Sequence, residues 1–276
     1  VKTMTINSIS GINNNQNINF GHGHRRKSKE PVSPLERNGV LATTLAGVGT
    51  SLALIAKKQG FSLSPSKIAQ TPIKDWAIFK TFNKQHPDRK LLELEEKEIL
   101  TLAGGSVAGG LAGGLMFDKK HNRKAKFKEA LNQLLGNVLV PVACVGGASR
   151  LYDKYKKQIL SHVPQINIKN LTDNKLKTAK FINKFLKILP SAGITLAALG
   201  TGIVAGNKVS NFINEKVYHK KVERKIKGTD FAPHVDDLGM AITLMADKSF
   251  VSTLITKTVP AFLCVPGFET GTAKEN

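Results

Sequence analysis

Few side chains in this sequence are spaced for chemistry, and the best candidates lie around His234. Asp236 and Asp237 follow this histidine closely. A histidine beside carboxylates can bind a metal ion or hold a proton, but an aspartate near a helix start more often caps free N–H groups. We therefore expect capping here. His22 and His24 could bind a transition metal loosely, but they lie in a polar stretch where we expect no site.

The two cysteines give no sign of a metal or redox site. Cys144 and Cys264 each lie in an apolar stretch, and the sequence contains no CxxC pair. We expect two buried free thiols, with a disulfide between them as the alternative. A P-loop is absent, and no nucleophile with a neighbouring base can be named. The sequence therefore predicts no enzyme activity, no cofactor and no metal ion.

The composition points to an anionic partner. The chain has 276 residues and a formal net charge of +21. A field of that sign attracts nucleic acid or the anionic face of a membrane. Aromatic residues make up only 6% of the sequence, which is few for a protein that stacks on single-stranded bases. The balance favours anionic lipid headgroups and makes nucleic acid the less expected partner.

Charged residues leave four long apolar windows of the sequence free. These windows are residues 38–56, 99–117, 130–149 and 188–207. Each has about the length that a helix needs to cross a bilayer, and lipid excludes isolated strands. We therefore expect an all-α protein with about four glycine- and alanine-rich transmembrane helices, plus amphipathic interfacial helices. A soluble helical bundle is the alternative, because the hydrophobicity of the windows is modest.

The remaining segments suggest a simple domain organisation. Residues 1–37 are polar and basic and are expected to be a disordered tail, and residues 38–276 to form a single helical membrane domain. A fifth apolar stretch, 238–268, is interrupted by charges and prolines and is expected to be a re-entrant or interfacial pair of helices. Two apolar stripes predict amphipathic helices, which either lie at the headgroup boundary or pack against the rest of the protein. They are Ile73, Trp76, Phe79 and Phe82, and Val209, Phe212, Ile213 and Val217, the latter continuing the fourth window toward a C-cap at Gly228.

Small residues recur every four positions in two of the windows. Gly105, Gly109 and Gly113 do so in the second, and Gly202 and Gly206 in the fourth. Such rows let another helix backbone approach closely. We expect the second and fourth helices to pack through these faces, which could also support a homo-oligomer. In this pattern alone the segment resembles glycine-zipper membrane proteins, and the resemblance implies no function.

The predicted membrane topology rests on one short basic loop. Residues 118–129 carry Lys119, Lys120, Arg123 and Lys124, which we expect to contact anionic lipid. The positive-inside rule places this loop, and with it the N-terminus, in the cytoplasm. The other connecting segments are also basic, which would be explained if some windows form hairpins that do not cross.

Three functions are compatible with this pattern. The first is a non-enzymatic, multi-pass membrane protein that binds or organises anionic lipid. The second is a channel, translocase or transporter subunit, although the four windows contain no ionisable residue, which argues against a coupled ion transporter. The third is a soluble, basic, helical protein that binds nucleic acid.

Overall fold

The fold is entirely helical in the part of the chain that the structure describes. This computed structural model describes residues 30–80, 85–86, 88–169, 171–219, 225–235 and 257–275, which form helices and no strand. The prediction of an all-α protein is confirmed. The elements are α1 (Pro34–Lys58), α2 (Pro65–Gln70), η1 (Ile73–Asp75), α3 (Glu96–Phe117), η2 (Lys120–Asn122), α4 (Arg123–Leu131), the π-helix η3 (Asn132–Leu139), α5 (Val140–Ser161), α6 (Asp173–Lys216), η4 (Gly228–His234) and α9 (Cys264–Thr272).

Each uncharged window lies in a helix that is long and apolar enough to cross a membrane. α1 and α3 follow the first two windows closely, but the last two windows lie in helical runs of 42 and 44 residues, Lys120–Ser161 and Asp173–Lys216. The second run is about 66 Å long, more than twice the thickness of a hydrocarbon core. The lysines that flank these windows therefore lie largely on helical extensions beyond them, not in loops.

α1 begins inside the predicted tail. The Ser33 hydroxyl accepts a hydrogen bond from the Glu36 backbone N–H at 3.2 Å, and Pro34 occupies the first turn. Lys57 and Lys58 lie in the last turn, where cations favour the helix dipole. The helix thus starts four positions before the first window. Residues 1–29, which include both candidate histidines of the tail, lie outside the described residues.

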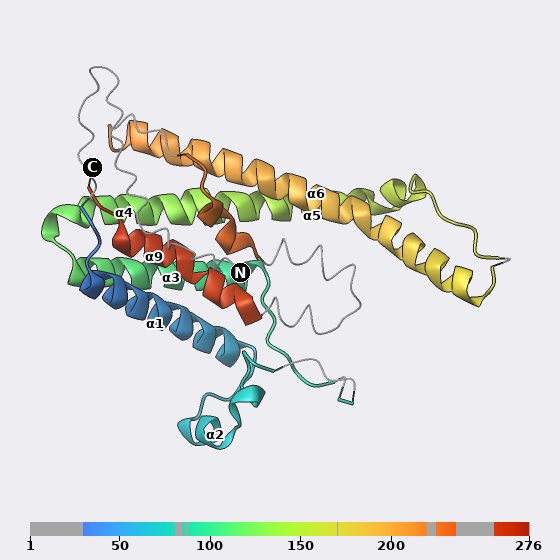
Figure 1. Cartoon of the computed structure of the whole chain (residues 1–276), viewed down its shortest axis with the longest axis horizontal. Helices are drawn as coiled ribbons and strands as arrows, with labels where there is room; N and C mark the ends of the chain where they lie inside the picture. Colours follow the sequence, from blue (N-terminus) through green and yellow to red (C-terminus); the bar gives the residue numbers. More distant parts are fainter. Residues whose placement is uncertain are drawn as a thin grey trace, which may run out of the picture.

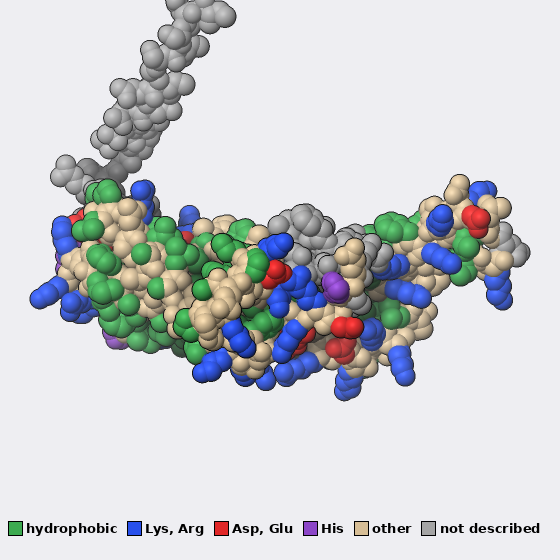
Figure 2. Space-filling view, turned by 90° about the horizontal axis from the view of Figure 1, so that it is seen from below, with side chains coloured by type: hydrophobic (Ala, Val, Ile, Leu, Met, Phe, Trp, Pro, Cys, Tyr) green, Lys and Arg blue, Asp and Glu red, His purple; other side chains and the backbone are tan. Residues whose placement is uncertain are grey.

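The helices form two groups that share the run from α4 to α5. α3 packs on α1, and α9 lies in the groove between them, while α6 packs on α5 and η3 (Figure 1). α5 and α6 extend together beyond the other helices. From the α1 side, hydrophobic side chains cover much of the surface around α1, and Lys and Arg gather at the end near α4 and along the α5–α6 extension (Figure 2). The apolar core lies between α1, α3 and the segment leading into α9.

The glycine rows contact neighbouring helices within the chain. Gly105, Gly109 and Gly113 lie against the backbone and side chains of α1, so closely that an added Cβ would overlap them. Gly202 lies on α5, where a Cβ would be 2.6 Å from Pro141 Cα, and Gly206 lies on the backbone of η3. The second and fourth windows therefore use their glycine faces on different neighbours, α1 and the η3–α5 run, and not on each other.

Two sequence expectations differ from the structure. The stripe that begins at Ile73 forms one short 3₁₀ turn, not an amphipathic helix, because Trp76 is already extended and its indole N–H donates back to the Thr71 carbonyl at 3.0 Å. Phe82 lies outside the described residues. The other stripe does continue the fourth helix, but α6 ends at Lys216, and Gly228 begins η4 instead of capping α6.

Candidate functional site

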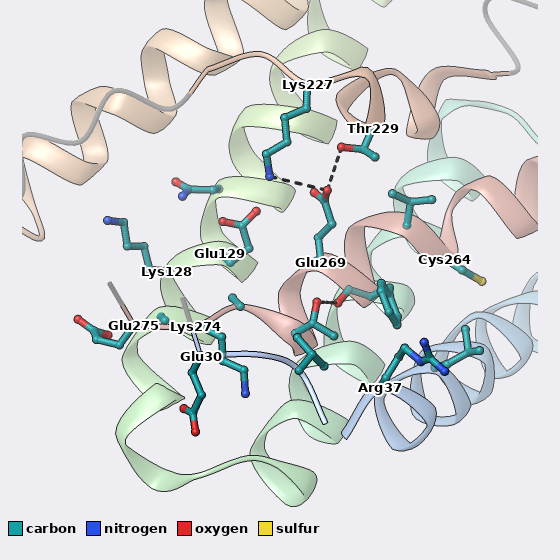
Figure 3. Close-up of a pocket in the computed structure, with 18 of the residues that line it drawn as sticks. Glu30, Arg37, Lys128, Glu129, Lys227, Thr229, Cys264, Glu269, Lys274 and Glu275 are labelled. Atoms are coloured by element: carbon teal, nitrogen blue, oxygen red, sulfur yellow. Dashed lines mark hydrogen bonds and ion pairs between the residues drawn. The ribbon is translucent and has the colours of Figure 1, made fainter. Parts of the chain in front are cut away.

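A large groove lies over α9 at the end of the bundle where α4 begins. Its volume is about 1540 Å³, above the usual range for pockets that hold a drug-sized molecule. α9 supplies an apolar floor that includes Val265 and Phe268, and the start of α1 supplies Arg37 and Leu41 on one side. α4 and the segment before η4 form the other side (Figure 3). The groove thus combines apolar and charged walls.

Two carboxylates, Glu129 and Glu269, line the polar side of this groove, and the buried Gln133 amide bridges them. Gln133 Nε2 donates to Glu129 Oε1 at 2.8 Å and to Glu269 Oε2 at 2.6 Å. Thr229 Oγ1 donates to Glu269 Oε1 at 2.8 Å, and Lys227 Nζ lies 3.9 Å from the same oxygen. Figure 3 shows Lys227 and Thr229 converging on Glu269 from the segment above α9. Both N–H groups of Gln133 are therefore used, and the two carboxylates are held on its two sides.

The polar contacts continue from Gln133 into the bundle. Asn137 Nδ2 donates to Gln133 Oε1 at 2.9 Å and to Asp230 Oδ1 at 2.8 Å. His234 Nε2 lies 2.8 Å from the Asn137 carbonyl oxygen, and because that oxygen only accepts, Nε2 must donate. This bond ties the buried His234 side chain of η4 to the backbone of the π-helix η3.

These contacts form a polar row that runs from Glu269 through Gln133 and Asn137 to Asp230 and His234. The row joins two cavities. His234 also lines a second cavity of about 480 Å³, whose wall includes Glu96 from the opposite end of α3. The row runs along η3, and π-helical segments are frequent at functional sites. Asp230 and His234 are each 1% exposed. The four windows themselves contain no ionisable residue, but segments outside them place the ionisable side chains of Asp230 and His234 against Asn137 in the third window.

Four charged residues form a buried ionic cluster at the same end of the bundle. Lys126 Nζ lies 3.2 Å from Glu36 Oε1 and 2.7 Å from Asp118 Oδ2, and Lys274 Nζ lies 2.7 Å from Glu36 Oε2 and 2.8 Å from Asp118 Oδ1. Each side chain is at most 5% exposed. Lys126 also donates to the Gly271 carbonyl. The cluster is neutral in total, and it ties the C-terminal segment to α1, α3 and α4.

The pKa values of two members are shifted in opposite directions. Burial alone would raise the pKa of Asp118, but hydrogen bonds from Lys126 and Lys274 outweigh it and hold this pKa well below its ordinary value. Burial would lower the pKa of Lys274, but its bonds to Asp118 and Glu36 raise it above its ordinary value. Both charges are therefore stabilised by their partners.

The predicted lipid-contact residues lie at the start of α4. Lys119, Lys120, Arg123 and Lys124 are all exposed, and Lys119 forms an ion pair with Glu30. Lys126, from the same basic loop, is instead buried in the ionic cluster. Lys124 lies two positions before Lys126, which is about half a helical turn, so the two side chains lie on opposite sides of α4.

The remaining candidates are not brought together as a catalytic or metal site. Cys144 and Cys264 are both free, as expected, but only Cys264 is buried and Cys144 is half-buried. Asp236 and Asp237 lie outside the described residues, which leaves the capping prediction open. Among the described residues, no group of three His, Cys, Asp or Glu side chains could hold a metal ion. No protein family, curated protein or solved structure matches this chain.

Proposed function

We propose that this protein is a non-enzymatic, multi-pass membrane component that binds a phospholipid in the groove over α9. The observation that carries the proposal is the pairing of an apolar floor with cations that have no acidic partner among the described residues. Arg37 and Lys225 are such cations, and both line the groove. A phospholipid suits this combination best. Its phosphate would bind between the basic side chains, and its acyl chains would lie on the apolar floor.

The surroundings of the groove also suit a lipid. Leu41 and Phe262 are each 42% exposed, and Leu45, one turn farther along α1, is 53% exposed. These side chains offer an apolar surface that acyl chains can cover. The exposed basic start of α4 lies at the same end of the bundle and adds attraction of about 1 kcal/mol per cation to an anionic leaflet.

We also propose that both described ends of the chain lie on the cytoplasmic side. Four crossings return the chain to the side where it started. Glu30 and Glu275 meet at the loop between α3 and α4, since Lys119 pairs with Glu30 and Asn122 Oδ1 accepts from the Glu275 backbone N–H at 3.0 Å. This is the short basic loop that the positive-inside rule assigns to the cytoplasm. A homo-oligomer would need a surface other than the glycine faces, because the chain already covers them.

Lipid binding is tested by removing the two unpartnered cations. Delipidated protein in detergent is titrated with phosphatidylglycerol, and the Arg37→Gln and Lys225→Gln double variant is expected to bind roughly 25-fold more weakly, at about 1 kcal/mol per charge. The matched control is Lys177→Gln with Lys180→Gln, two exposed cations on the α6 extension, which should leave binding unchanged. Phosphatidylglycerol binding no tighter than diacylglycerol of the same chains would refute the proposal.

A channel or transporter subunit is the second candidate, favoured by the polar row. Three carboxylates, Glu129, Glu269 and Asp230, lie along a row of hydrogen bonds between two cavities. Acidic side chains inside a membrane bundle commonly mark cation pathways. In this structure the hydrogen bond between the Asn137 and Gln133 side chains blocks the path along the row. A cation could pass only if these two side chains moved apart.

Cation passage predicts potassium efflux from loaded proteoliposomes faster than from protein-free vesicles. Asp230→Asn is expected to slow this efflux several-fold, because it removes one buried charge from the row. Asp153→Asn, an exposed position on α5, is the control and should have no effect. Efflux equal to that of empty vesicles would remove this candidate and leave lipid binding untouched.

A further inference from the structure

Three large apolar side chains are exposed on the connection between α1 and α3. Ile73 is 64% exposed, Phe79 42% and Trp76 38%. They lie on consecutive turns, since the Trp76 N–H donates to the Ile73 carbonyl at 3.1 Å and the Phe79 N–H to the Trp76 carbonyl at 2.9 Å. The Trp76 and Phe79 ring centroids are 6.5 Å apart. Large apolar side chains that gather on a surface commonly mark contact with a membrane or another protein.

The fold itself holds these side chains outward. Ala77 and Ile78, which lie between the two exposed rings, pack against the apolar core instead. Asp75 forms an ion pair with Arg89, which fixes the turn from the other side of the connection. The exposed patch is therefore part of a segment that is tied to the bundle.

The chemistry of the segment suits a lipid headgroup boundary. The indole N–H of Trp76 already donates to the Thr71 carbonyl at 3.0 Å. The ring can therefore enter a less polar environment without leaving a buried donor unpaired. Lys67 and Lys74 are exposed cations of the same segment. Aromatic and aliphatic side chains beside lysine are the mixture that lies at a membrane interface.

The segment leaves α1 where the first uncharged window ends. Lys57 and Lys58 occupy the last turn of α1, and the chain then turns at Gly60, whose φ is 80°. The Gln59 side chain bonds the backbone C=O and N–H of Glu93 at 2.7 and 3.0 Å, which ties the end of α1 to the approach of α3. The part that contains α2 projects to the side of α1 (Figure 1). It thus lies at the level where both helices pass from apolar to charged sequence.

We propose that residues 72–79 anchor the protein in the headgroup boundary of the leaflet opposite the N-terminus, with Ile73, Trp76 and Phe79 inserted. The inference rests on the membrane-spanning part of the proposed function and not on a lipid in the groove. The partner is lipid because three partly exposed side chains offer less than the roughly 800 Å² per partner that a stable protein interface buries, whereas a bilayer surface accepts a small patch.

The fluorescence of Trp76 tests this directly, because the chain has one tryptophan. Full-length protein is reconstituted into phosphatidylcholine vesicles whose acyl chains carry bromine near the carbonyl, near the middle or near the terminal methyl. Quenching by the shallow bromines is expected to exceed quenching by the deepest ones by at least about twofold, since tryptophan favours the interface over the hydrocarbon core.

Two moved tryptophans calibrate the depth scale. In a Trp76→Phe background, Leu45→Trp changes an exposed side chain near the middle of the first window and should be quenched most by the deepest bromines. Ile168→Trp in the same background changes an exposed side chain on the connection between α5 and α6. It should be quenched by aqueous acrylamide and not by any brominated lipid.

A pair of double variants separates apolar insertion from charge attraction. Ile73→Ser with Phe79→Ser keeps the tryptophan but removes its apolar neighbours, so shallow-bromine quenching is expected to fall to less than about half and acrylamide quenching to rise. Lys67→Gln with Lys74→Gln removes two exposed cations from the same segment and should leave the quenching of Trp76 unchanged. Equal changes in the two double variants would overturn apolar insertion.

The outcomes distinguish the anchor from the proposed function. Quenching of Trp76 by acrylamide alone, with Leu45→Trp still quenched by the deepest bromines, would overturn the anchor while the membrane-spanning helices stand. Strongest quenching of Trp76 by the deepest bromines, or quenching by neither lipid nor acrylamide, would place it in the hydrocarbon core or under another protein surface, and either result overturns the anchor. Acrylamide quenching of Leu45→Trp as well would overturn the membrane-spanning helices and the anchor with them.

Discussion

Lys126→Met is expected to lower the free energy of unfolding by about 3–5 kcal/mol, which is the usual cost of removing one partner from a buried ion pair. Lys126 is fully buried and contacts both Glu36 and Asp118. Without it, two carboxylates remain in a water-poor site with only Lys274 to balance them. The measurement is thermal or denaturant unfolding of the purified protein in detergent.

The control for this variant lies two positions earlier in the same helix. Lys124→Met removes the same charge from an exposed position and should change the free energy of unfolding by less than about 0.5 kcal/mol. Adding Asp118→Asn to Lys126→Met restores neutrality, so the double variant should be more stable than the sum of the single effects predicts. Equal effects of Lys124→Met and Lys126→Met would show that the cluster is not a stabilising unit.

The cluster also predicts that the free energy of unfolding depends on pH, with one limit at acidic pH and one at basic pH. Because the pKa of Asp118 is lowered in the folded state, its contribution is present above the ordinary value of 3.8 and is lost as pH falls toward the folded pKa. Because the pKa of Lys274 is raised, its contribution is present below 10.5 and is lost as pH rises through the folded pKa. The stability difference between wild type and Lys274→Met should therefore be constant between these limits and shrink outside them.

Gly110→Leu is expected to release α9 from α3. The α carbon of Gly110 lies against the Gly267 backbone, and an added Cβ would overlap it, so relief requires a backbone shift and not a side-chain rotation. Overpacking usually costs about 1–3 kcal/mol, and a contact between two backbones leaves little room for relaxation. The readout is the rate at which Cys264 reacts with a thiol reagent in a Cys144→Ser background, because Cys264 is only 9% exposed while α9 is docked.

Gly104 provides a matched control on the same helix. A Cβ at Gly104 would have no atom within 4 Å, so Gly104→Leu should be tolerated or slightly stabilising, since glycine is a poor helix former. Gly110→Leu should speed the labelling of Cys264, and Gly104→Leu should not. Equal labelling of the two variants would mean that the close approach of Gly110 and Gly267 does not hold α9 in place.

The sequence predicts the helices better than it predicts their lengths and partners. Uncharged windows identify the four long helices because the absence of charge is a local property. The charged residues that bound the last two windows do not end a helix, since glutamate, arginine and lysine are good helix formers, so α5 and α6 run on. Glycine rows predict close packing, but several helices could fill each row. α9, from the far end of the chain, packs with Gly267 and Gly271 on another pair of α3 glycines, Gly110 and Gly114.

Most of the candidate site could not be predicted from the sequence, because its contacts join residues that are far apart in the chain. Lys274 and Glu36 are 238 positions apart, and Glu269 meets Gln133 across 136 positions. A charged side chain outside an apolar window is normally solvated, and only the tertiary fold shows that these are buried.

The lipid groove and the polar row acquire their proposed roles only if the four long helices cross a bilayer. Alkaline carbonate extraction of membranes from cells that produce the tagged full-length protein tests this most directly. Membrane insertion predicts that the protein stays in the pellet and is released only by detergent. Release into the carbonate supernatant would contradict it, and the same helices would then be the core of a soluble, basic bundle.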